Sequence, residues 1–256
     1  MPHLFIFGLG YTASRLAVAL RKRGWTIEAT GSAGDIAFTD GAAVRDALTR
    51  ADHILSSVPP AQESDPVLDR YGDDITQQWV GYLSSTGVYG DADGAWVDES
   101  APTGGGRRTT RAACDARWME RGAHVFRLPG IYGPGRSAFD RLHSGKAKRI
   151  DLPGQVFSRI HVDDIVAAVM ASLHAPVGAY NIADDLPASS NAVIEEACRL
   201  ANIEQPPLQT LDEAELSPMA RGFYAENRRV ANGKAKRILG WTPQYPTYRE
   251  GLRSLL

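Results

Sequence analysis

The chain has 256 residues, 43% of them hydrophobic and 23% charged, and its formal net charge is −2. A chain of this size and composition suits one soluble globular unit, or a large domain with a smaller lobe. The flat charge balance argues against nucleic acid or an acidic membrane surface as a partner. No apolar run approaches the roughly 20 residues that cross a bilayer, and no secretory leader is evident, so we expect a cytoplasmic protein.

Short apolar runs alternate with helical patterns in the first half of the chain. A strand is predicted at 4–7 (LFIF), and the helix after it carries apolar residues at i, i+3, i+4 and i+7 from Ala13. Further strands are predicted at 25–30, 53–58, 79–85 and 124–128. They are nearly continuous apolar runs, which is typical of strands buried on both faces. With helices between them, they predict an α/β fold with a doubly wound parallel sheet.

The pattern changes after residue 130. Residues 130–136 (GIYGPGR) read as a loop. Helices are predicted at 164–174, 189–203 and 232–240, with one more strand at 179–183. The polar, proline-rich segment 204–218 is interpreted as a mobile lid or connector. Both cysteines, Cys114 and Cys198, fall in helical patterns, which indicates buried free thiols rather than a disulfide framework, and we expect no metal site.

A glycine-rich turn, GLGYTA (8–13), lies between the first strand and the first helix. In this spacing Gly8 permits the tight turn, Gly10 lets the backbone approach a pyrophosphate, and Ala13 lets helix and strand pack closely. The helix that begins near Tyr11 and Thr12 offers free N–H groups and a positive dipole to phosphates. The context predicts dinucleotide binding, and the alternative is a glycine turn that binds no ligand.

The second strand does not end on the acid that usually holds the ribose of NAD. The sequence there is ATGSAGD, so the first acid is Asp35, and no arginine is present to grip a 2′-phosphate. Ser32 and the nearby backbone can accommodate that phosphate. We therefore expect NADP in preference to NAD as the cofactor.

Five separated motifs resemble one protein family. They are LSSTGVYGD (83–91), RLPGIYGPGR (127–136), RIHVDDI (159–165), YNIAD (180–184) and LGWTPQYPTYREGL (239–252). Together they resemble the NAD(P)-dependent epimerase/dehydratase group of the extended short-chain dehydrogenase/reductase superfamily. The resemblance implies a Rossmann-type domain (1–130 plus 161–183) and a small C-terminal substrate lobe (131–160 plus 184–256). Relatives often form a homodimer through two helices on the outer face of the sheet, and the oligomeric state of this chain is left open.

The resemblance also implies roles for matching positions. Ser85 falls at the family's Ser/Thr, which hydrogen-bonds the reacting oxygen of the substrate; the alternative is a hydroxyl that satisfies backbone at a strand end. His161, Asp163 and Asp164 are interpreted as a helix cap and a strand–helix junction. Residues expected beside the cofactor, in addition to the glycine turn and Ser32, are Ser57, Val58, Pro59, Ser84 and Pro129.

The tyrosine and lysine of the family's Y-x-x-x-K pair are absent. The alignment of RAACD (111–115) places Arg111 at the lysine position and Arg107 at the tyrosine position. Arginine is a poor general acid because its pKa exceeds about 12. Arg111 is a candidate to hold a ribose hydroxyl or phosphate, and Arg107 or Arg108 to bind an anionic substrate group; the alternative is that these arginines are simply exposed in a first helical turn. This departure resembles the atypical branch of the superfamily.

Two functions follow as hypotheses. The first is an NAD(P)-dependent oxidoreductase or epimerase/dehydratase-like protein that acts on a small anionic or sugar-nucleotide-like substrate. In it Ser85 polarises a carbonyl and the proton comes from water or from a residue such as Tyr89 or Tyr132. The second is a non-catalytic NADP(H)-binding protein that senses redox state.

Overall fold

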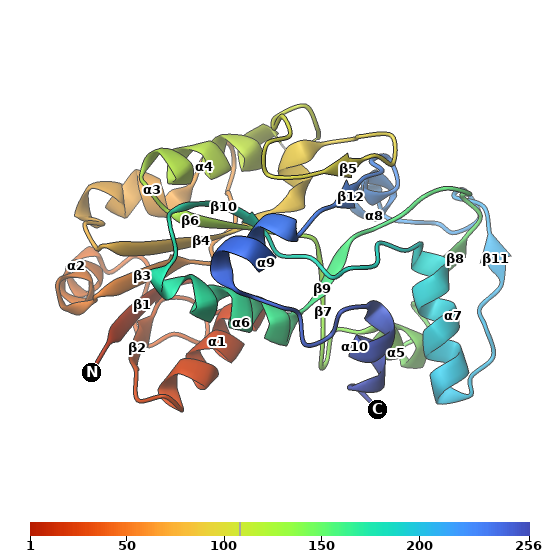
Figure 1. Cartoon of the computed structure of the whole chain (residues 1–256), viewed down its shortest axis with the longest axis horizontal. Coiled ribbons are helices and arrows are strands. Elements are labelled where there is room, and N and C mark those ends of the chain that lie inside the picture. Colours follow the sequence, from red (N-terminus) through yellow and green to blue (C-terminus); the bar gives the residue numbers. More distant parts are fainter. Residues whose placement is uncertain (108) are drawn as a thin grey trace.

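The computed structural model describes residues 1–107 and 109–256. A six-stranded parallel sheet forms its centre (Figure 1). The strands, in their order across the sheet, are β10 (Gly178–Asn181), β6 (His124–Leu128), β4 (Trp79–Ser85), β3 (His53–Ser56), β1 (His3–Phe7) and β2 (Thr26–Ala29). The chain first runs outward from β1 to β2 and then returns to β3 on the other side of β1. In open α/β sheets such a reversal leaves a crevice, here at the carboxyl ends of β1 and β3.

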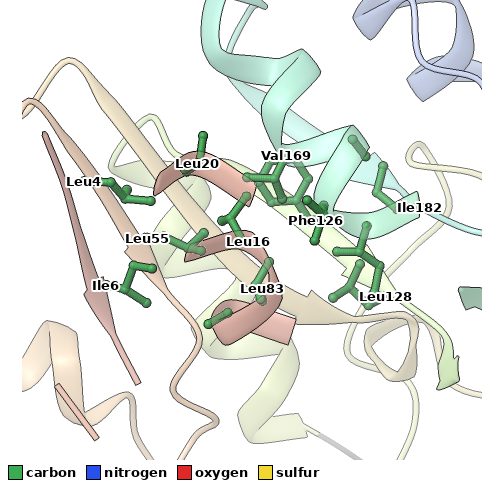
Figure 2. Packing of buried hydrophobic residues seen from close by; sticks show 14 of the residues in the cluster. Leu4, Ile6, Leu16, Leu20, Leu55, Leu83, Phe126, Leu128, Val169 and Ile182 are labelled. Atoms are coloured by element: carbon green, nitrogen blue, oxygen red, sulfur yellow. The ribbon is translucent and has the colours of Figure 1, made fainter. Parts of the chain in front are cut away.

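Helices cover both faces of the sheet (Figure 1). On one face lie α1 (Tyr11–Arg21), α6 (Val162–Ala171) and α9 (Gly233–Leu239). On the other face lie α2 (Gly41–Arg50), α3 (Pro66–Tyr71) and α4 (Thr109–Glu120). Figure 2 shows Leu16 and Leu20 of α1 packed over the strand residues Leu4, Leu55 and Leu83. Because each face of the sheet buries apolar side chains, the strands read as continuous apolar runs, and the predicted Rossmann-type α/β fold is confirmed.

The remaining elements form smaller pairs and short helices. Three two-stranded parallel pairs are β7 (Gly130–Tyr132) with β9 (Arg159–His161), β8 (Arg149–Ile150) with β11 (Leu208–Gln209), and β5 (Trp96–Val97) with β12 (Arg229–Val230). The helices are α5 (Ala138–His143), α7 (Ser190–Ala201), α8 (Pro218–Phe223) and α10 (Tyr248–Arg253). Short 3₁₀ turns occupy η1 (Gly72–Asp74), η2 (Thr86–Tyr89) and η3 (Ser172–His174). The division of the chain into two domains stays a prediction.

The loop predicted at 130–136 was wrong in its first part, because residues 130–132 form β7 and pair with β9 some 30 residues later along the chain. The segment 204–218 does connect two helices, and its β11 pairs with β8. Cys114 and Cys198 are free and buried, as predicted. Within the described residues, no helix has both the length and the apolar character to cross a membrane.

Candidate functional site

The glycine turn connects β1 to α1 through backbone contacts. The Gly8 N–H donates to Thr30 Oγ1 (3.1 Å), and the Leu9 N–H donates to the Thr30 carbonyl (2.8 Å). Gly8 has a φ of +85°, and a Cβ there would lie 2.9 Å from Cγ2 of Val58. Gly8 is therefore required by both backbone conformation and space.

Neither backbone conformation nor crowding explains the glycine at position 10. It lies in an extended conformation (φ −88°, ψ −168°), and a Cβ built on it meets no atom of the described residues within 4 Å. The first hydrogen bond of α1 runs from the Ser14 N–H to the Gly10 carbonyl (2.8 Å). The N–H groups of Tyr11 and Thr12, the two residues that follow Gly10, therefore have no partner within the helix. A dinucleotide diphosphate fits this cradle of free N–H groups and open space.

The loop after β2 does not present an acid to a ribose. The Asp35 carboxylate accepts the Ala29 N–H (2.8 Å) and so holds its own loop to the end of β2. A Cβ on Gly34 would lie 2.4 Å from the Ala29 carbonyl oxygen, which shows how closely this loop folds back. Ser32 is exposed at the tip of the loop. The preference for NADP over NAD stays a prediction.

A cleft of about 1250 Å³ opens beyond the carboxyl ends of the central strands. Several of the residues predicted for the site line it together: Thr12, Ser57, Pro59, Ser84, Ser85, Arg107, Arg111 and Pro129. The glycine-turn residues Gly8, Gly10 and Tyr11, together with Val58 and Ser32, lie outside this lining. Arg108 lies outside the described residues. The structure thus places Ser85, Arg107 and Arg111 in one cleft with Thr12, which lies in the first turn of α1.

Ser85 ends β4 and lines the cleft. Its Oγ accepts the Gly87 N–H (3.1 Å), which caps the short turn η2. Since this bond uses a lone pair of Oγ, the hydroxyl hydrogen stays available to a ligand oxygen. Both interpretations of Ser85, as a backbone cap and as a hydrogen-bond donor to a substrate, are compatible with this geometry.

A buried ion pair lies under the end of β4. Arg127 of β6 contacts Asp115 of α4 through Nη2 and Oδ2 (2.7 Å), with side-chain exposures of 7% and 2%. Ser84 Oγ donates to the same carboxylate (2.6 Å), and Arg127 Nη1 donates to the Tyr89 hydroxyl (3.0 Å). The Tyr89 hydroxyl in turn donates to Asn181 Oδ1 (2.7 Å). This network connects β4, β6, β10 and α4 beneath the cleft.

The two tyrosines considered as proton donors are placed unfavourably for that role. The Tyr89 hydroxyl is held in the buried network, and Tyr89 is not among the described residues that line the cleft. Tyr132 does line the cleft, but its hydroxyl is buried against Gly251 and has no hydrogen-bond partner in the described part of the chain. Burial raises the pKa of both hydroxyls above the ordinary value. The geometry therefore argues against either tyrosine as the proton donor.

Arg107 and Arg111, which the sequence comparison predicts at the tyrosine and lysine positions of the family that the chain resembles, both line the cleft. Arg111 donates through Nη1 to the Tyr82 hydroxyl of β4 (3.0 Å) and is half-buried. Arg107 lies 3.3 Å from Glu226 through Nε, and its backbone N–H donates to the same carboxylate (3.1 Å). Its guanidinium also lies 5.6 Å from the ring centroid of Phe223. Arg111 is thus a cation that contacts the neutral hydroxyl of Tyr82, whereas the Glu226 carboxylate balances the positive charge of Arg107.

The cleft is strongly cationic, which the sequence did not reveal. Among its described lining residues, eight are arginine or lysine and three are acidic, although the whole chain is slightly acidic. The cations not singled out from the sequence as site residues are Arg136, Arg141, Lys146, Lys148, Arg159 and Arg228. A cleft lined by one sign of charge concentrates ligands of the opposite sign.

His161 and the aspartates after it have structural roles, as predicted. The Asp163 N–H donates to His161 Nδ1 (3.2 Å), so His161 caps α6. The Asp164 carboxylate accepts the N–H groups of Gln244 and Tyr245 (2.6 and 3.2 Å). These bonds tie the start of α6 to the C-terminal segment.

The chain is similar in sequence to two curated proteins, YeeZ and a reductase, over different shares of its length. It is 27% identical to "Protein YeeZ" of Escherichia coli (strain K12) over an alignment of 287 positions, gaps included, that covers 96% of this chain and 97% of YeeZ. It is 31% identical to a 3-diazoavenalumate denitrifying reductase of Streptomyces over an alignment of 168 positions, gaps included, that covers 59% of this chain and 54% of the reductase. A scan against protein-family models found no match.

Solved structures extend the comparison. A conserved protein of unknown function from Silicibacter pomeroyi is 42% identical over the whole chain and 98% of its own length, with a TM-score of 0.89. The human epimerase family protein SDR39U1, solved with NADPH, is 13% identical with a TM-score of 0.78, covering 99% of this chain and 98% of its own. The dTDP-glucose 4,6-dehydratase of Bacillus anthracis, solved with NAD, is 14% identical with a TM-score of 0.76, covering 100% and 95%.

Proposed function

We propose that the chain is an epimerase/dehydratase-like protein of the extended short-chain dehydrogenase/reductase superfamily, and that it acts as an NAD(P)-dependent oxidoreductase of a small anionic substrate. The observation that carries the proposal is the meeting of three features at one edge of the sheet. They are the glycine-turn cradle, the hydroxyl of Ser85 and the excess of cations in the cleft.

The cradle supports the cofactor part of the proposal. The free N–H groups of Tyr11 and Thr12 would hold the diphosphate, and Gly10 leaves the room for it. Ser57 and Pro59 at the end of β3, with Pro129 after β6, would lie along the rest of the dinucleotide. When bound, the nicotinamide supplies or accepts a hydride.

Ser85 and Arg111 are proposed to stabilise negative charge on the substrate oxygen. The Ser85 hydroxyl would donate a hydrogen bond to it, and the Arg111 guanidinium would add a fixed positive charge. Neither side chain is a general acid at neutral pH, because a guanidinium does not release its proton in proteins and a serine hydroxyl is a very weak acid. Water is therefore proposed as the proton source.

The cation excess supports an anionic substrate, and the reductase relative supports reduction rather than epimerisation. The experiment is to mix the purified protein and NADPH or NADH with a panel of carbonyl compounds that carry carboxylate or phosphate groups. Oxidation of the reduced nicotinamide is followed by absorbance. For an active compound, Ser85→Ala is expected to lower kcat about 100-fold, the usual loss of one oxyanion donor.

Ser254→Ala serves as the matched control. The Ser254 hydroxyl donates a hydrogen bond to the Gly251 carbonyl at the end of α10, and Ser254 is not among the described residues that line the cleft. It should leave kcat unchanged. Equal kcat values for the wild type and Ser85→Ala would contradict the proposed role of Ser85.

One observation favours the redox-sensing alternative. The residue at the tyrosine position, Arg107, is committed to Glu226 rather than free to act on a substrate. A sensor would bind NADP⁺ and NADPH with unequal affinity and would show no turnover with any compound of the panel. Turnover with one compound would exclude a purely sensing role.

A further inference from the structure

The ring of Tyr11 contacts two arginines. Tyr11 is the first residue of α1, and the guanidinium carbons of Arg15 and Arg136 lie 5.6 and 5.7 Å from its ring centroid. Such distances are typical of cation–π contacts. Arg15 follows one helical turn later on α1, whereas Arg136 comes from the segment between β7 and α5. Tyr11 therefore joins the phosphate cradle to a loop far away in the sequence.

This loop is firmly held against α1. The Tyr11 hydroxyl donates to the Pro134 carbonyl (3.1 Å). A Cβ on Gly133 would lie 2.7 Å from the Tyr11 hydroxyl oxygen, so only glycine permits so close an approach. Gly133 and Arg136 exchange two backbone hydrogen bonds (3.2 and 3.0 Å), and Ser137 then caps α5. The backbone that carries Arg136 is thus fixed by contacts on both sides.

The two arginines differ in charge compensation. Arg15 forms an ion pair with Asp163 at 3.0 Å. Arg136 has no acidic partner among residues 1–107 and 109–256. It is exposed and lines the cleft, as does Thr12, one of the residues whose N–H group borders the cradle. An uncompensated guanidinium therefore stands beside the N-terminus of α1.

We propose that Arg136 is a further cofactor-binding residue, which supplies the side-chain cation for the diphosphate that the N–H groups of α1 hold. The inference rests on the proposed function, since it requires a dinucleotide in the cradle. A guanidinium donates two parallel hydrogen bonds to phosphate oxygens, which suits it to this role better than an ammonium group. Tyr11 positions Arg136 by its ring and positions the loop by its hydroxyl.

Calorimetric titration with defined fragments tests the proposal. NADP⁺ and ADP-ribose share the diphosphate, whereas adenosine lacks it. Arg136→Gln is expected to weaken binding of NADP⁺ and ADP-ribose by the same factor, roughly 10- to 100-fold, and to leave adenosine binding unchanged. The loss should shrink as salt concentration rises. Arg136→Lys should recover part of the affinity, because it keeps the charge without the planar fork.

Arg15→Gln is the matched control, since it removes a cation at the same distance from the same ring. Its affinities for NADP⁺ and ADP-ribose should stay within about threefold of the wild type, because Arg15 is already paired with Asp163. Equal losses in the Arg15 and Arg136 variants, or none in either, would overturn the proposal. A wild-type protein that binds neither NADP⁺ nor ADP-ribose would instead refute the proposed function itself.

Discussion

Removal of the Asp115 carboxylate is predicted to destabilise the protein strongly. In Asp115→Ala the Arg127 guanidinium, whose side chain is 7% exposed, loses its bidentate partner and stays buried. Ser84 loses its hydrogen-bond acceptor in the same substitution. Loss of one member of a buried ion pair costs about 3–5 kcal/mol. For a chain of this size each kcal/mol lowers Tm by roughly 2–4 °C, so we expect a decrease of roughly 6–20 °C.

Denaturant unfolding and calorimetry measure this loss directly. Asp69→Ala is the matched control, because it breaks the Arg117–Asp69 pair, whose side chains are 40% and 45% exposed. That exposed pair should contribute at most about 1 kcal/mol. The double variant Asp115→Leu/Arg127→Met should be more stable than Asp115→Ala, since it leaves no buried charge. If Asp115→Ala and Asp69→Ala lowered the free energy of unfolding by the same small amount, the buried pair would not stabilise the floor of the cleft.

Two further predictions concern titration and thiol reactivity. Burial raises the pKa of Asp184 to about 8, well above its unfolded value near 4, so the folded state keeps a proton that the unfolded state releases. The free energy of unfolding of the wild type relative to Asp184→Asn should therefore fall by about 1.4 kcal/mol per pH unit as pH rises from 5 to 7, and less steeply towards pH 8. A difference independent of pH would contradict this. Cys114 and Cys198 are buried and free, so a thiol reagent should modify them slowly in the native protein and rapidly after unfolding; rapid native modification of both would contradict their burial.

The central sheet could be predicted from the sequence because its signals are local. The strands at 79–85 and 124–128 have the predicted bounds, since both are continuous apolar runs that lie inside the sheet. The short β7 was missed because it is defined by pairing with β9 rather than by its own composition. Two- and three-residue strands carry too little pattern to be read from a sequence.

The spacing of the sequence motifs predicted that two candidate site residues would lie close together. Ser85 at the end of β4 and Arg111 on α4 line one cleft, since the strand and the helix pack directly together. Tyr89 and Tyr132 were plausible proton donors because the sequence does not show where a hydroxyl points. Arg136 was not singled out, because its place beside Tyr11 depends on a contact between residues more than 120 positions apart.

The proposed function requires that the glycine turn bind the diphosphate of a nicotinamide dinucleotide. The most direct measurement is a calorimetric titration of wild type and Gly10→Val with NADPH, NADP⁺, NADH and NAD⁺. The Cβ of a valine at this position meets no described neighbour, so the unfolding transition should be unchanged. The valine should, however, prevent two charged hydrogen bonds between the N–H groups of α1 and the diphosphate, and so weaken dinucleotide binding roughly 100-fold or more. Absence of binding to the wild type, or equal affinity in the two proteins, would contradict the account.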